Sequence, residues 1–376
     1  MKTHQTPSGK TTQLPSHLFS WRRAAWHAYA RYLASTKKPI FVGPWRGEIG
    51  FEVLYWIAFV EQFAHGYKIA PERLIPISRG GASSLYGMPS GVEIYAMRTP
   101  QEVRLENRLG VMKTGMFKQT SVTPFDLRLI RDAMDTMNVK DCHVLHPAWM
   151  YHTLAPFWTA KKGIDWMSPR VRYRILRAQP GILDAVTLPE QFIAVKFYSR
   201  MTFPGGHKVV QRFVLSAIEQ MVSEAHIICL DHDHYLDDHS DITSSIRGDR
   251  VHHMSDFLPV TPENNLLIQV ALLERSMGFV GTYGGFAQLA LRMGKPSVSF
   301  YLDWNNATSI VHRMLADSLS LNMGVPAIVL RIAELPMLTH VLPEMRIAPS
   351  GPSPLALKTE LAEARATLPT PDLQTA

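Results

Sequence analysis

Strand-like and helical segments alternate from residue 192 to residue 301, and this alternation constrains the fold more than any other feature of the sequence. The expected order is strand 192–198, helix 209–224, strand 226–230, strand 251–254, helix 262–275, strand 278–280, helix 286–293 and strand 297–301. Strands that alternate with helices form parallel sheets with right-handed crossovers. The second half of the chain is therefore predicted to be a doubly wound α/β domain.

Residues 39–185 repeat this plan less regularly, with strands expected at 39–43, 73–77, 92–98 and 143–146, and helices at 51–63 and 124–137. The pattern breaks around residues 178–189, where proline and glycine predict the linker between two domains. We expect an N-terminal tail and basic helix at 1–38, a first α/β domain at 39–185 and a second at 186–335. Residues 336–376 are expected to be a partly disordered, flexible C-terminal segment.

Composition excludes several classes of protein. The chain has 376 residues with a net charge of +7, and its two cysteines, Cys142 and Cys229, supply neither a disulfide framework nor a cysteine-rich zinc site. Lysine and arginine do not gather into the blocks that bind nucleic acid. No stretch reaches the roughly 18 apolar residues of a membrane span. We therefore expect a cytoplasmic protein, and the modest positive charge fits a phosphorylated or otherwise acidic ligand.

A helix is expected from Trp21 to about Ser35, with a loose apolar face and several basic residues around it. A basic amphipathic helix that contains tryptophan can lie on a membrane surface. Amphipathic helices more often pack on the domain behind them. Packing is the favoured interpretation, and a peripheral contact of residues 21–38 with the inner face of a membrane stays open.

A glycine-rich turn follows the strand 278–280 and leads into the helix 286–293. Gly281, Gly284 and Gly285 allow a sharp turn and a close approach of the backbone to another group. The helix N-terminus behind such a turn offers free N–H groups to an anion. The turn therefore indicates either a phosphate site or a tight connection without a ligand.

Two glutamates follow the first expected strand of the chain. Glu48 lies in the turn that begins at Pro44. Glu52 lies four residues later, in the first turn of a helix. Acidic side chains near a helix N-terminus can simply complement its dipole. A carboxylate at the C-terminal end of a parallel strand can also act as a general base. We expect one of the two to be functional, with Glu48 slightly favoured because a turn is more exposed.

Cations and polar residues follow the strands of the second domain. Lys196 and Arg200 lie at the end of strand 192–198, where they could meet a diphosphate or remain solvated. The loop after strand 226–230 begins with Asp231 and His232 and runs to His239. Its residue types suit zinc or manganese, but a loop at this position also faces the base or ribose of a nucleotide. The sequence favours the nucleotide, and no metal site is assigned.

The segment from Trp149 to Trp166 is rich in aromatic residues and looks irregular. Sugars and lipids both stack on aromatic rings, so Trp149 and Tyr151 could line an acceptor pocket. A wedge of core under a loop is an equally good interpretation.

Three of these motifs together resemble the GT-B glycosyltransferases, and most closely the metal-independent inverting groups that are fucosyltransferase-like or heptosyltransferase-like. The segment Phe279–Phe286 looks like their turn at the donor phosphates. Lys196 to Arg200 resembles the strand end that offers an arginine to the donor, and Gly47–Gly50 resembles the glycine loop near the acceptor. The chain departs from the fucosyltransferase pattern, which has His-x-Arg where Lys196-Phe197-Tyr198 stands.

The resemblance implies two Rossmann-like domains that face each other across a cleft. It also implies transfer of a sugar from a nucleotide-sugar donor to a hydroxyl of a glycan or glycolipid, with no further cofactor and no nucleic-acid partner. Glu48 or Glu52 would be the catalytic base, and Trp45, Arg46, Trp149 and Tyr151 would contact the acceptor. The donor would be held by Lys196, Arg200, Asp231, His232, Thr282, Tyr283, Gly284, Gly285 and Phe286.

Two other classes of function remain open from the sequence. A protein of the same shape could be a nucleotide-sugar epimerase or hydrolase. It could also be a non-catalytic protein that binds a nucleotide or a sugar. The sequence does not name the sugar, the nucleotide or the acceptor.

Overall fold

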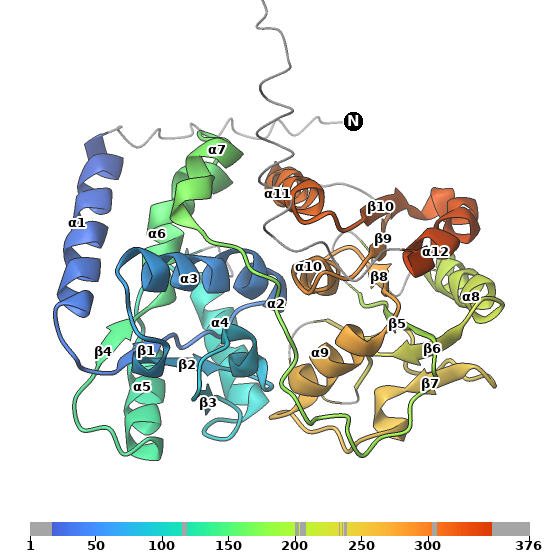
Figure 1. The fold of residues 1–376 in the computed structure, drawn as a ribbon, viewed down its shortest axis with the longest axis horizontal. Coiled ribbons are helices and arrows are strands. Elements are labelled where there is room, and N and C mark those ends of the chain that lie inside the picture. Colours follow the sequence, from blue (N-terminus) through green and yellow to red (C-terminus); the bar gives the residue numbers. More distant parts are fainter. Residues whose placement is uncertain are drawn as a thin grey trace, which may run out of the picture.

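The computed structural model describes residues 17–114, 119–199, 203, 208–232, 234, 236, 239–302 and 307–347. Two α/β halves lie side by side, each built on its own sheet (Figure 1). We call residues 17–170 the first half and residues 192–347 the second half. A segment without helix or strand, 171–191, runs between them.

The first half contains a four-stranded parallel sheet in the order β3-β2-β1-β4. Its strands are β1 (Ile40–Val42), β2 (Leu74–Ser78), β3 (Val92–Glu93) and β4 (His143–Leu145). The helices around it are α1 (His17–Ala34), α2 (Ile49–Phe51), the π-helix η1 (Glu52–Trp56), α3 (Ile57–Gly66), α4 (Pro100–Thr114), α5 (Pro124–Thr136), α6 (Pro147–Trp158) and α7 (Ile164–Met167). Short 3₁₀ turns complete it at η2 (Pro71–Arg73), η3 (Ala82–Tyr86) and η4 (Ser168–Arg170).

The second half contains a six-stranded parallel sheet in the order β10-β9-β8-β5-β6-β7. Its strands are β5 (Phe192–Lys196), β6 (His226–Cys229), β7 (Val251–His253), β8 (Phe279–Thr282), β9 (Ser297–Tyr301) and β10 (Ala327–Arg331). Its helical elements are α8 (Lys208–Val222), η5 (Met254–Asp256), α9 (Asn265–Arg275), α10 (Gly285–Arg292), α11 (Ala307–Met323), η6 (Ile332–Met337) and α12 (Leu338–Ile347).

Strand order reverses within each sheet. In the second sheet, β5 to β7 step outward in one direction, and β8 to β10 then step outward in the other, so β5 and β8 are neighbours. In the first sheet the corresponding neighbours are β1 and β4. Loops diverge at such a reversal and leave a crevice beyond the carboxyl ends of the strands, where open α/β sheets bind ligands. The sheet topology therefore points to the loops after β1, β4, β5 and β8.

The expected class, α/β with parallel sheets, is confirmed, and the differences are local. The segment expected to be irregular around Trp149 is mostly the helix α6, because its aromatic residues pack against neighbouring helices. The extended run expected at 92–98 shortens to the two-residue strand β3. Helix α9 begins at Asn265 rather than near 262. Helix α12 was not expected, and its apolar residues pack into the second half with α8.

The N-terminal helix packs inward over its described side chains, residues 24–34. Trp26, Ala30 and Leu33 are buried in the core of the first half, as the packing interpretation expected. The Tyr29 hydroxyl also donates a hydrogen bond to the carbonyl of Val144 at 2.5 Å. Among the described helices, none combines the length and the apolar character that crossing a bilayer requires.

Candidate functional site

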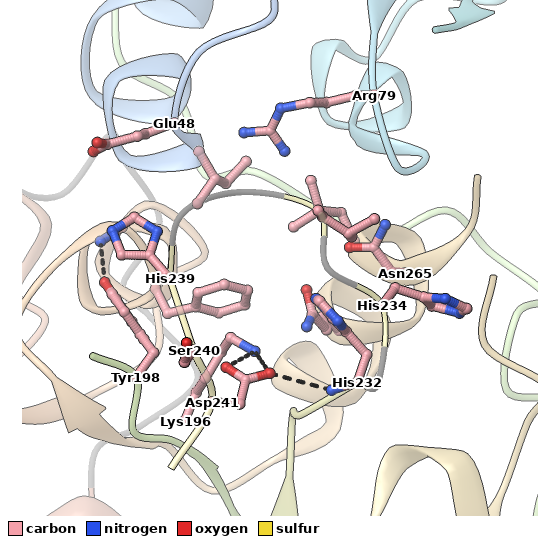
Figure 2. Close-up of a pocket in the computed structure, with 16 residues that line it drawn as sticks. Glu48, Arg79, Lys196, Tyr198, His232, His234, His239, Ser240, Asp241 and Asn265 are labelled. Carbon is pink, nitrogen blue, oxygen red and sulfur yellow. Dashed lines mark hydrogen bonds and ion pairs between the residues drawn. The ribbon is translucent and has the colours of Figure 1, made fainter. Parts of the chain in front are cut away.

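A cavity of about 190 Å³ lies where the two halves meet. Figure 2 shows its walls: Glu48 and Arg79 come from the first half, and the residues opposite them come from the second half. The first half also contributes Ile49. The second half contributes Lys196, Tyr198, His232, His234, Leu236, His239, Ser240, Asp241, Asn265, Leu266, Gln269, Gly285 and Phe286. The cavity thus collects the loops after β1, β5 and β8, which the strand reversals indicate, together with residues that follow β2, β6 and β7. The loop after β4, which the reversals also indicate, does not line it.

Glu48 lies at the first-half wall, with its side chain exposed. It is the N-cap residue of α2, and its extended backbone (φ −66°, ψ 147°) lies outside the helix. The loop before it is tied to β2, because Trp45 N–H donates to the carbonyl of Ile77 at 2.8 Å. A carboxylate held on a fixed loop at a cavity wall can accept a proton from a bound hydroxyl.

Glu52 has a different environment from Glu48. It is fully buried and does not line the cavity. One carboxylate oxygen accepts hydrogen bonds from the Ser78 hydroxyl at 2.5 Å and from the Tyr86 hydroxyl at 2.8 Å. Burial raises the pKa of Glu52 to about 7, although the charge of Arg79 and these two hydrogen bonds act in the opposite direction. Glu52 therefore supports the wall from behind and has no direct access to a ligand.

Arg79 is a cavity residue that none of the sequence motifs predicted. It follows β2 directly, and its guanidinium donates from Nε and from Nη2 to the carbonyl of Gly47, the Nε bond measuring 3.1 Å. Glu93 holds the next turn, accepting from the backbone N–H groups of Gly80 at 2.8 Å and Gly81 at 2.7 Å. The signal available in the sequence was the position of Arg79 at a strand end before two glycines. Arg79 fixes the residue that precedes Glu48.

Lys196 forms the floor of the cavity on the second-half side (Figure 2). Its ammonium group lies 3.0 Å from Asp241 Oδ1 and donates to the carbonyl of Leu230 at 2.7 Å. Asp241 also accepts from the backbone N–H of His232 at 3.2 Å. The ammonium lies 5.3 Å from the centre of the Phe286 ring. Because Asp241 balances the charge of Lys196, this pair mainly ties β5 to the loop after β6.

The N-terminus of α10 opens onto the same cavity. Gly285 is its first residue, and the backbone N–H of Gly285 donates to the Tyr198 hydroxyl at 3.1 Å. Thr282 links the ends of β8 and β5, because its hydroxyl accepts a hydrogen bond from Tyr198 N–H at 3.0 Å and donates one to the Tyr198 carbonyl at 3.2 Å. A helix N-terminus in a crevice at the reversal between β5 and β8 is a site for an anion.

The glycines of this turn are also required by packing. A Cβ on Gly281 would lie 2.1 Å from the carbonyl oxygen of Lys196, so β8 and β5 could not pair with a side chain there. A Cβ on Gly285 would lie 2.7 Å from Ile49 and 3.0 Å from the backbone nitrogen of Gly50. The structure thus explains Gly281 by strand pairing and Gly285 by contact between the halves.

The four residues expected at the acceptor lie away from the cavity walls. Arg46 is buried, and its guanidinium donates to Asp126 Oδ1 at 2.8 Å and to Asn107 Oδ1 at 2.7 Å. The buried ring of Trp45 stacks between Trp56 and Tyr151, with centroids 6.1 and 6.2 Å away. Trp45, Arg46 and Tyr151 therefore hold the loop after β1 in place. The sequence pattern did not distinguish this structural role from contact with a ligand.

Trp149 packs elsewhere. Its ring stacks on Tyr29 with the centroids 4.9 Å apart and lies 5.8 Å from Trp26, so it fastens α6 to α1. The interpretation of this aromatic segment as core is the one that the structure supports for Trp149 and Tyr151.

The residues expected at the donor divide into three groups. Lys196, His232, Gly285 and Phe286 line the cavity together with Glu48. Asp231, Thr282, Tyr283 and Gly284 lie beside it but are not part of its lining. Arg200 lies outside the described residues, as do Asp233, Tyr235, Asp237 and Asp238 of the histidine-rich loop. The lining also includes polar residues outside the expected set, among them Arg79, Tyr198, Asp241, Asn265 and Gln269.

Within the described part of the chain, one group has the spacing of metal ligands. The ligand atoms of Cys229, Asp231 and His253 lie within 4.8 Å of one another, and all three residues are buried. The His253 ring is already engaged, because Nε2 lies 2.8 Å from the carbonyl of Ile246 and 2.8 Å from the guanidinium of Arg247. A cation at hydrogen-bond distance disfavours a metal on that nitrogen, so we assign this group a structural role.

Comparison with known proteins gives distant structural matches. No family model matches the chain, and no curated protein matches it. Among solved structures, it is similar to the dodecameric iron-containing heptosyltransferase TibC in complex with ADP-D-beta-D-heptose, with 13% identity over 71% of this chain and 59% of that chain and a TM-score of 0.36. This chain therefore spans less than two thirds of the length of TibC.

Two further matches cover the whole of the other chain. The spinosyn rhamnosyltransferase SpnG, complexed with thymidine diphosphate, is 12% identical over 86% of this chain and 100% of that chain, with a TM-score of 0.30. The UDP-GlcNAc 2-epimerase of Neisseria meningitidis, bound to UDP-GlcNAc, is 11% identical over 86% of this chain and 100% of that chain, with a TM-score of 0.27. These similarities are too low to assign a family, so the function has to be argued from the site.

Proposed function

We propose that this protein is a glycosyltransferase that moves a sugar from a nucleotide-sugar donor to a hydroxyl of a glycan or glycolipid acceptor. In this proposal the two halves are Rossmann-like domains arranged as in GT-B enzymes. The observation that carries it is the content of one cavity. An exposed carboxylate, Glu48, stands on one wall, and the N-terminus of α10 with Lys196 stands on the other.

The two walls suit the two ends of such a reaction. Glu48 would take the proton from the acceptor hydroxyl as that oxygen attacks the anomeric carbon. The bond from that carbon to the donor diphosphate would break on the opposite side, and the nucleoside diphosphate would leave with the electron pair. The N–H groups at the start of α10 would stabilise its negative charge. One displacement of this kind inverts the configuration at the anomeric carbon.

The N-terminus of α10 and the polar side chains on the second-half wall favour a nucleotide rather than an apolar ligand. Lys196 and His232 bring N–H donors to the crevice, and the amide side chains of Asn265 and Gln269 add groups that can pair with a base or a ribose. The Gln269 amide donates to the carbonyl of Leu230 at 2.7 Å, which fixes its orientation toward the loop after β6. No cofactor beyond the nucleotide sugar enters the proposal.

The first experiment is a thermal-shift screen of the whole protein with ADP, UDP, GDP, TDP and their common sugar conjugates. A ligand that binds the native state raises the unfolding temperature. We expect at least one nucleoside diphosphate to do so. The sugar donor that corresponds to it is then supplied with and without candidate acceptors, and the products and their anomeric configuration are followed by NMR.

The base assignment is tested with Glu48→Gln and a matched control, Glu219→Gln, which changes an exposed glutamate on α8. Loss of a general base lowers turnover by about 10²- to 10⁴-fold. We expect that loss for Glu48→Gln with donor binding retained, and normal turnover for the control. Full turnover in Glu48→Gln overturns the assignment. A product formed from the donor without any acceptor would instead indicate an epimerase or hydrolase, and binding without turnover would indicate a nucleotide-binding protein.

A further inference from the structure

The hydroxyl of Tyr198 occupies the anion-binding end of α10. It lies 3.1 Å from the backbone nitrogen of Gly285 and accepts that N–H. A phosphate oxygen at a helix N-terminus would accept the same N–H. The protein's own side chain therefore holds a position that the proposed donor diphosphate requires.

The backbone of Tyr198 is anchored, so any exchange at Gly285 has to come from its side chain. The Thr282 hydroxyl bonds to both the N–H and the carbonyl of Tyr198. Tyr198 also forms an antiparallel bridge with Asp241, the partner of Lys196. The Tyr198 ring lies at the cavity wall, edge-on to His239 with the ring centroids 5.1 Å apart (Figure 2).

We propose that Tyr198 is a nucleotide-responsive residue, whose hydroxyl caps α10 in the ligand-free protein and is displaced from Gly285 by a donor phosphate oxygen. This inference rests on the proposed function, because it takes the ligand to be a nucleoside diphosphate. The exchange favours the phosphate, since a hydrogen bond to a charged oxygen is roughly twice as strong as one to a neutral hydroxyl. A nucleoside without phosphates has no group that could drive the exchange.

The displacement has a measurable consequence for affinity. Each nucleoside diphosphate that binds has to break the Gly285–Tyr198 hydrogen bond first, whereas Tyr198→Phe has no such bond to break. A net hydrogen bond of ordinary strength corresponds to about 2- to 10-fold in a dissociation constant. We therefore expect Tyr198→Phe to bind a nucleoside diphosphate about 2- to 10-fold more tightly than the wild type, with the affinity for the matching nucleoside unchanged.

The experiment is calorimetric titration of the wild type, Tyr198→Phe and Tyr67→Phe with the nucleoside diphosphate that gives the largest thermal shift, and with its nucleoside. Tyr67→Phe is the matched control, because it removes a hydroxyl that bonds His27 at 2.7 Å outside the cavity lining. The control should leave the affinity for both ligands as in the wild type.

Unchanged or weaker diphosphate binding by Tyr198→Phe, with the control normal, overturns the displacement and leaves the donor site standing. An equal gain for nucleoside and diphosphate also overturns it, because the effect would then be independent of phosphate. A wild type that binds no nucleoside diphosphate overturns the proposed function itself. Should Tyr198→Phe not fold, a crystal structure of the wild type with the diphosphate decides: Tyr198 Oη still bonded to Gly285 N–H contradicts the proposal.

Discussion

Gly285 at the start of α10 and Gly50 in α2 lie backbone against backbone, and neither has room for a side chain. A Cβ on Gly50 would lie 2.9 Å from Gly285 Cα, and a Cβ on Gly285 would lie 3.0 Å from Gly50 N. The contact joins the two halves beside Glu48. A second contact lies on the other side of the cavity, where Leu267 N–H donates to the carbonyl of Gly80 at 2.9 Å. The width of the cavity is therefore set by close backbone packing on both sides.

Gly50→Ala and Gly285→Ala should each force the two halves apart. Overpacking of a well-packed contact costs about 1–3 kcal/mol, and we expect a loss of stability in that range together with weaker nucleotide binding. Chemical denaturation and titration with the nucleoside diphosphate measure the two effects. Gly110→Ala is the control, because nothing lies within 4 Å of its Cβ position in α4. That change should stabilise the protein slightly, and an equal loss in all three variants would contradict the packing argument.

Asp126 holds the loop after β1 through a buried network. It accepts from Arg46 Nε at 2.8 Å, and His146 Nε2 lies 3.4 Å from its other oxygen. Burial alone would raise the pKa of Asp126, but His146 and Arg46 outweigh it and lower the pKa to about 2. Because the native pKa is depressed, the stabilising contribution is present above the unfolded value near 4 and is lost as the pH falls toward 2.

Asp126→Asn should therefore destabilise the protein strongly, since it leaves the Arg46 guanidinium buried without its counter-charge. Breaking a buried pair in this way costs about 3–5 kcal/mol. The measurement is urea denaturation at pH 7. Asp141→Asn is the comparison, because Asp141 pairs with Lys38 at the exposed surface and its loss should have little effect. Similar losses in the two variants would show that Asp126 contributes no more than a surface pair.

Glu52 should make stability depend on pH in the opposite sense. Burial raises its native pKa to about 7, so between its ordinary value of 4.5 and about 7 the unfolded chain releases the proton while the native state keeps it. Wild-type stability therefore falls as the pH rises through this window, by on the order of 3 kcal/mol. Glu52→Gln has no carboxyl group to titrate at this position. Its free energy of unfolding should therefore rise relative to that of the wild type over the same window.

The Glu52 prediction is checked by denaturation at pH 5, 6, 7 and 8. The difference between Glu52→Gln and the wild type should grow with pH and then level off. Burial also raises the pKa of Glu93 to about 7. Because Glu93 is present in both proteins, its contribution cancels in the difference between them. A difference that stays constant with pH would mean that Glu52 is ionised throughout this range in the native protein.

Lys196 and Asp241 should behave as one unit. Lys196→Met leaves the nearly buried Asp241 carboxylate without its ammonium partner, and Asp241→Asn leaves the ammonium of Lys196 without its carboxylate. Each single change should cost about 3–5 kcal/mol. The double variant should recover part of the loss, because neither charge remains. Denaturation of all four proteins gives the coupling between the two residues, and strictly additive losses would exclude a direct interaction.

The α/β class and most elements of the second half could be predicted because their signals are local. The alternation from residue 192 to 301 gave strands and helices whose bounds differ from the observed ones by a few residues. The prediction of an irregular segment around Trp149 was wrong for a physical reason. Its rings show no clear helical stripe, because α6 is covered on several sides, by α1 through Trp149 and by the loop after β1 through Tyr151.

The candidate site was predicted in part. Strand ends and glycine turns mark where ligands meet a parallel sheet, which is why Glu48, Lys196, Gly285 and Phe286 were expected and do line the cavity. Nothing in the sequence separates a charge that faces a cavity from one that is paired inside the protein. Arg46 is paired with Asp126, eighty residues away, and Arg79 lies at the cavity.

The sequence by itself determined the α/β plan, the strand ends that carry charged residues and the position of the glycine turn before α10, because these depend on neighbours along the chain. Only the tertiary structure placed Glu48 at the cavity and Glu52 in the interior. Glu48 is an extended N-cap residue at the cavity wall, whereas Glu52 is enclosed by Ser78 and Tyr86. Tertiary structure likewise showed that Gly285 meets Gly50 and Tyr198. Burial and partners come from segments far apart in the chain, and no local pattern encodes them.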